Sequence, residues 1–64
     1  MKFNTEKFKE MVKDKGWTIS IAAKKIRVTD RTIYLWLEKT YLPSNTSIDR
    51  MCELFKCEYQ DLIT

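Results

Sequence analysis

The sequence predicts an all-α domain, a compact bundle of five short helices. Only one glycine and one proline occur among the 64 residues, too few for the many turns that an all-β fold needs. Apolar residues make up 44% of the chain and charged residues 33%, which is typical of an ordered globular protein. This length allows a single domain, residues 1–64, with little room for an enclosed pocket beside its core.

Phe3 and Asn4 indicate where the first helix begins. Asn4 can cap the N-terminus of a helix over residues 4–15, and Phe3 in front of the cap can pack onto Phe8. Gly16 follows and can adopt the left-handed conformation that ends a helix.

Two further short helices follow, separated by only a few residues. Thr18 can cap a helix over about 19–26, and Thr29 can cap another over about 30–38. Small alanines in the helix over about 19–26 let the helix over about 30–38 approach closely. Residues at helical spacing form the inner faces of this pair: Ile19, Ala22, Ala23 and Ile26, then Ile33, Trp36 and Leu37.

The rest of the chain predicts two more helices. Ser44 or Asn45 can cap a fourth helix that ends near Phe55, and a short fifth helix covers about 58–63. We expect the inner positions of these helices to be Ile48, Met51, Cys52, Phe55, Tyr59 and Leu62.

The run Ile33–Leu37 is apolar throughout and cannot all face one way. Tyr34 and Leu35 lie ~100–200° around the helix from the inner face. We therefore expect both side chains to point away from the core, beside Arg31.

Two short helices joined by about three residues are typical of a helix-turn-helix, whose second helix enters the major groove of DNA. The net charge of +3 lies within residues 24–39, where five basic residues stand against two acidic ones. Such an excess is expected on a surface that meets phosphate, but solvated lysines give the same pattern. Charge alone does not separate the two interpretations.

Four segments carry a resemblance to a known family: FKEMVKDKGWT, AAKKIRVTDRTIYLW, LPS and MCELFKCEYQDLI. In their order and spacing they resemble the Cro- and repressor-type (XRE-like) helix-turn-helix proteins of phages and bacteria. The resemblance spans nearly the whole chain and implies a lambda-repressor-like fold. It also implies a regulator of transcription, of repressor or Cro type, that binds double-stranded DNA sequence-specifically.

The resemblance assigns DNA contacts to particular residues. Proteins of this family read bases mainly from the first turns of the recognition helix, here Asp30, Arg31, Thr32 and Leu35. Arg31 suits this role because arginine pairs bidentately with guanine, whereas Asp30 also suits the positive end of the helix dipole. The residues expected at the DNA backbone are Thr18, Ile19, Lys25, Arg27, Thr29, Tyr34, Lys39 and Tyr41.

The chain departs from the family pattern at several positions. Arg27 and Lys39 stand where glycine is usual, so at Arg27 a non-glycine residue is expected to take a left-handed conformation. Leu37 replaces a glutamate, Ile19 a DNA-contacting glutamine and Ala22 a larger apolar residue. These changes affect DNA contact more than the fold.

Composition also argues against several classes of protein. With no histidine, no glycine-rich phosphate loop and only two cysteines, we expect neither catalysis nor a metal or other cofactor. Cys52 and Cys57 are expected to be small buried residues rather than disulfide partners. No segment is apolar enough to span a membrane or direct export, so we expect a cytoplasmic protein.

Two other functions and one assembly remain open. An excisionase-like module fits residues 18–43 but needs strands where residues 46–55 are helix-periodic. A homodimer would have to use the C-terminal region, about 57–64. A protein-binding module, such as an antirepressor, would use exposed apolar residues at positions where DNA readers are usually polar: Ile19, Ile21, Tyr34 and Leu35.

Overall fold

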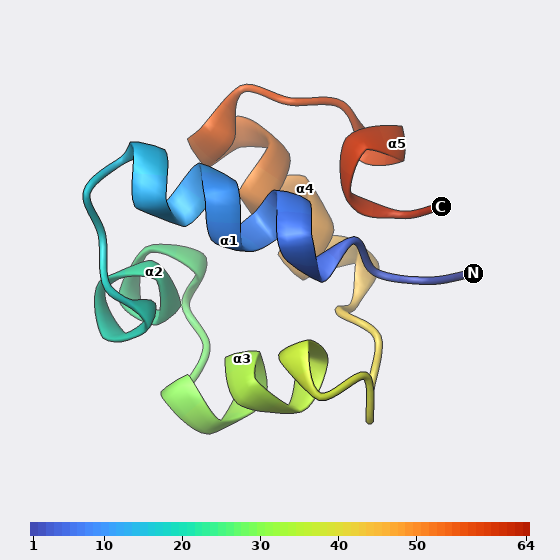
Figure 1. Ribbon diagram of the computed structural model, residues 1–64, viewed down its shortest axis with the longest axis horizontal. Helices are drawn as coiled ribbons and strands as arrows, with labels where there is room; N and C mark the ends of the chain where they lie inside the picture. Colours follow the sequence, from blue (N-terminus) through green and yellow to red (C-terminus); the bar gives the residue numbers. More distant parts are fainter.

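The computed structural model describes residues 1–64 as five helices with short connections (Figure 1). The helices are α1 (Thr5–Asp14), α2 (Ile19–Ile26), α3 (Asp30–Leu37), α4 (Asn45–Phe55) and α5 (Tyr59–Leu62). The predicted all-α fold is confirmed, with α1, α3 and α5 slightly shorter than expected. Residues 45–55 are helical where an excisionase-like module would have strands. None of the five helices has the length and apolar character needed to cross a bilayer.

The first four helices begin at a short polar residue that accepts a hydrogen bond from the amide three residues later. These bonds satisfy amides that have no partner inside the helix. Of the two candidates at the start of α4, Ser44 is the cap. The donor–acceptor distances are 3.1 Å at Asn4 and 3.2 Å at Thr18, Thr29 and Ser44.

The same four helices are followed by a left-handed residue, and only one of these is glycine. The φ angles are 72° at Gly16, 70° at Arg27, 64° at Lys39 and 54° at Lys56. The amide of the next residue donates to the carbonyl five residues before it, at 2.9–3.1 Å, which closes a Schellman motif. The left-handed conformation expected at Arg27 is confirmed, and Lys39 shares it.

The core holds twelve buried apolar residues contributed by all five helices and both chain ends. Phe3 packs onto Phe8 as predicted, with ring centroids 5.5 Å apart, and also onto Trp36 at 6.1 Å. Ala22 and Ala23 are buried on α2, which packs against α3 and α4. The small side chains therefore allow the close approach that the sequence indicated.

Several residues predicted at inner or buried positions are less buried than expected. Tyr59 is 41% exposed, because the four-residue α5 buries only Leu62. Cys52 and Cys57 are half-buried free thiols that pack against the core rather than within it. Burial raises the pKa of the Cys57 thiol to about 11 and also raises the pKa of Cys52.

The two chain ends run side by side next to α5 (Figure 1). Phe3 and Ile63 form an isolated antiparallel bridge. Beside it, Lys2 and Thr64 exchange two backbone hydrogen bonds of 2.9 Å each. This short ribbon was not predicted, and it holds α1 and α5 together at the edge of the core.

Replacing Trp36 tests which residues of the apolar run in α3 support the fold. Trp36 is 3% exposed and Tyr34 is 50% exposed. We expect Trp36→Ala to lower the free energy of unfolding by about 3–5 kcal/mol, because a small core cannot collapse around so large a cavity. The matched control, Tyr34→Ala, should change it by less than about 0.5 kcal/mol. Chemical denaturation of both variants measures this, and equal losses would contradict the assigned faces.

Replacing Arg27 tests the turn between α2 and α3. A β-branched residue is strongly disfavoured at positive φ, so Arg27→Val should lower the free energy of unfolding by about 1–3 kcal/mol. Arg27→Gly should be at least as stable as the wild type, because relief of strain offsets the added flexibility of the unfolded chain. If thermal unfolding showed Arg27→Val to be as stable as Arg27→Gly, the left-handed backbone would not be required.

Candidate nucleic-acid interface

α2 and α3 pack against each other across a turn formed by Arg27 and Val28 (Figure 1). Inside the turn, the amide of Val28 donates to the carbonyl of Ala23 at 2.9 Å. From α4, the guanidinium of Arg50 donates to the carbonyl of Ile26 at 3.2 Å. This carbonyl ends α2 and has no partner within the helix. These two hydrogen bonds join the turn and α4 to α2, and together they fix the angle at which α3 leaves α2.

A side-chain hydrogen bond joins the first turns of α2 and α3. The Ser20 hydroxyl donates to Oδ2 of Asp30, and a carboxylate acceptor makes this a charge-assisted hydrogen bond. Ser20 was not among the predicted site residues. The sequence signal that could have indicated this bond is a serine at the start of one helix and an aspartate at the start of the next.

The four residues predicted to read bases differ in how available their side chains are. Asp30 and Arg31 are exposed on the first turn of α3. Thr32 is half-buried, and its hydroxyl lies 2.9 Å from the capping hydroxyl of Thr29. Leu35 is half-buried but is not among the residues packed against the core. Arg31 therefore has the greatest freedom to reach a ligand.

Five of the residues predicted at the DNA backbone lie in three places. Thr18 and Thr29 are exposed at the starts of α2 and α3, and Arg27 is exposed in the turn between them. Lys39 and Tyr41 are exposed in the loop that follows α3. The starts of α2 and α3 lie together, whereas this loop lies at the other end of α3.

Two of the predicted backbone contacts have side chains that lie against apolar neighbours. Ile19 is half-buried and packs against the core, so only its amide at the start of α2 is available to a phosphate. The Lys25 ammonium lies 5.8 Å from the centroid of the Trp17 ring, in cation–π range.

Exposed apolar residues also occur on α2 and α3. Ile21 is 40% exposed and Tyr34 is 50% exposed, as predicted for a partner surface. Ile19 and Leu35 were predicted to belong to the same exposed set, and this is wrong because both are half-buried. The exposed apolar surface here therefore comes from Ile21 and Tyr34 alone.

Similarity to known proteins agrees with this arrangement of α2 and α3. No curated protein and no solved structure is significantly similar to the chain. Residues 7–64 match the family of Cro/C1-type HTH DNA-binding domains, which leaves out only the first six residues. The matched part contains α2, the turn and α3 in full. The chain therefore belongs to the Cro/C1-type helix-turn-helix DNA-binding domains.

Proposed function

We propose that this protein regulates transcription by binding specific double-stranded DNA sites, with α3 in the major groove. The observation that carries the proposal is the exposed first turn of α3, held against α2 by the bond between Ser20 and Asp30. The major groove is ~12 Å wide and admits one helix, whose first residues meet the base edges. A first turn with a fixed position can present its side chains to the bases at low entropic cost.

The side chains on this turn suit different bases. Arg31 can donate two hydrogen bonds to guanine, which is the commonest specific contact in the major groove. Asp30 uses Oδ2 to accept from Ser20, and Oδ1 can accept from the N4 amino group of cytosine. Leu35 can contact the methyl group of thymine, and the Thr32 hydroxyl can bond to either a base or a phosphate.

Phosphate groups would be held on both sides of this turn. The amides at the start of α2 lie at the positive end of its dipole, a natural position for an anion. The basic excess of residues 24–39 adds attraction that does not depend on sequence. The side chains that we assign to the DNA backbone are Thr18, Lys25, Arg27, Thr29, Tyr34, Lys39 and Tyr41, with the amide of Ile19.

A two-fold dimer would let two copies of α3 read a palindromic site. Its interface would include the C-terminal region at 57–64, where Tyr59 presents an exposed ring. A different function is the binding of a protein partner on the surface of α2 and α3. The exposure of Ile21 and Tyr34 favours it.

Salt dependence tests whether DNA is the ligand. Binding that rests on phosphate contacts should weaken by ~0.9 log unit per log unit of salt for each phosphate neutralised. The measurement is fluorescence anisotropy with a sequence selected from random DNA, at several salt concentrations. Affinity that did not change with salt, or the lack of any complex at low salt, would contradict the proposal.

Arg31→Ala separates base reading from backbone contact. We expect it to cost ~1–3 kcal/mol on the selected sequence and to relax the preference at one base pair, because the bidentate pair with guanine is lost. Lys25→Ala should weaken selected and unrelated sequences alike. Competition titrations with both DNAs measure the two effects. Equal losses on both sequences for Arg31→Ala would make Arg31 a phosphate contact instead.

A further inference from the structure

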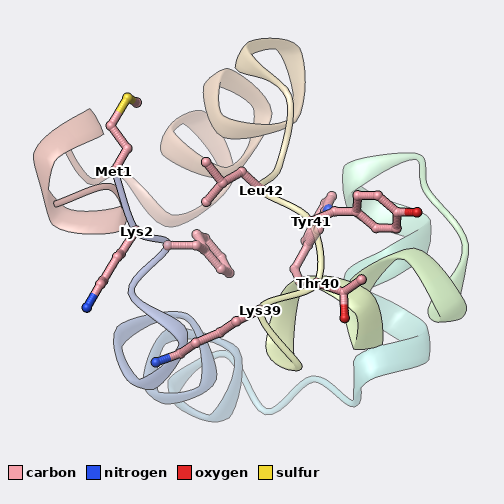
Figure 2. A pocket seen from close by; sticks show the side chains of 8 residues that line it. Met1, Lys2, Lys39, Thr40, Tyr41 and Leu42 are labelled. Carbon is pink, nitrogen blue, oxygen red and sulfur yellow. The ribbon is translucent and has the colours of Figure 1, made fainter.

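A groove runs along the N-terminal segment. It lies near the C-terminal end of α3, away from the first turn of that helix. Its larger part is a pocket of about 310 Å³ between this segment and the loop after α3 (Figure 2). A smaller hollow of about 190 Å³ continues the groove and shares Lys2, Phe3 and Lys39 with the pocket. The apolar part of the pocket lining comes from Met1, Phe3, Trp36, Tyr41 and Leu42.

The first observation that favours a ligand in this groove is the unpaired backbone of Phe3. Phe3 stands in the short antiparallel ribbon, between Lys2, which bonds to Thr64, and Asn4, which bonds to Leu62. In such a ladder the amide and carbonyl of the middle residue point to the opposite edge. Neither group has a backbone partner in the protein. The ribbon therefore offers one free edge along the groove.

The charges around the groove give the second sign. The pocket is lined by two lysines, Lys2 and Lys39, and by no carboxylate. Figure 2 shows both ammonium groups on the same side of the pocket. The one acidic residue in the groove, Glu6, lies in the smaller hollow. The groove thus combines an apolar pocket, a free strand edge and positive charge.

We propose that this groove binds an extended peptide of a partner protein in which an apolar residue is flanked by acidic residues. The peptide adds a third strand beside residues 2–4 and bonds to the amide and carbonyl of Phe3. Successive side chains of a strand face opposite sides. The apolar residue therefore enters the pocket beside Leu42, and its acidic neighbours lie across from Lys2 and within reach of Lys39.

A second copy of the chain suits the groove less well than an acidic partner. Antiparallel pairing of two such edges through Phe3 would place Lys2 of one copy opposite Asn4 of the other, and residues 1–5 of the second copy bring no carboxylate to Lys2 and Lys39. The groove shares Lys39 and Tyr41 with the proposed phosphate contacts, but the proposal does not depend on DNA binding, because none of its contacts involves the first turn of α3.

The test uses a capped hexapeptide that alternates glutamate with valine or leucine, added to the ¹⁵N-labelled full chain. We expect saturable binding, a downfield shift of the Phe3 amide and a shift of the Trp36 indole signal, because Trp36 lines the pocket. The same peptide methylated on alternate backbone nitrogens should not bind, since it cannot pair with a strand. Binding of the methylated peptide at equal affinity, or no binding of either, overturns the proposal.

Matched variants test the lining. Lys2→Glu reverses a charge in the groove, and Lys9→Glu makes the same change on an exposed face of α1 outside it. We expect the first to weaken peptide binding several-fold more than the second, and Leu42→Asp to abolish it while the domain stays folded. Equal effects of the two charge reversals overturn the proposal. So does protection of the Phe3 amide by self-association without peptide, measured together with sedimentation, which would make a second copy the occupant.

Discussion

The left-handed backbone of Arg27 determines where α3 can lie. It ends α2 and leaves only Val28 before the cap of α3, so the second helix turns away at once. Two hydrogen bonds hold this geometry. The amide of Val28 donates to the carbonyl of Ala23, and the guanidinium of Arg50 donates to the carbonyl of Ile26. A strained residue persists when its surroundings over-determine its conformation. The packing of α2, α3 and α4 imposes this constraint on Arg27. The position of α3, with its first turn exposed, is a consequence of the constraint.

The choice of basic residues at three helix ends has a physical reason. A left-handed non-glycine residue costs about 1–3 kcal/mol. Arg27, Lys39 and Lys56 each place a positive charge at the negative end of a helix dipole, which returns about 0.3–1 kcal/mol when exposed. The balance still favours glycine for stability alone. Two of the three, Arg27 and Lys39, belong to the proposed phosphate contacts, where a glycine would have no side chain to offer.

Much of the fold follows from short-range patterns, and the unpredicted features do not. Caps such as Thr18 and Thr29 act on an amide three residues away, and periodicity separates Trp36 from Tyr34 within one turn. The bonds between Ser20 and Asp30 and between Arg50 and Ile26 join residues 10 and 24 positions apart, so the residue types are visible in the sequence but short-range patterns do not pair them. The same holds for the ribbon between the chain ends. Tyr59 was misplaced because a four-residue helix has too few positions to define a face.

The proposed DNA contacts and the proposed peptide groove meet at the loop after α3. Lys39 and Tyr41 line the groove and also belong to the assigned phosphate contacts. A ligand changes the affinity for another only through a difference between the free and bound states. A lysine paired with a peptide carboxylate has lost its freedom to approach phosphate, and the peptide brings negative charge close to the path of the DNA. The two ligands would therefore oppose each other, even though the first turn of α3 stays in place.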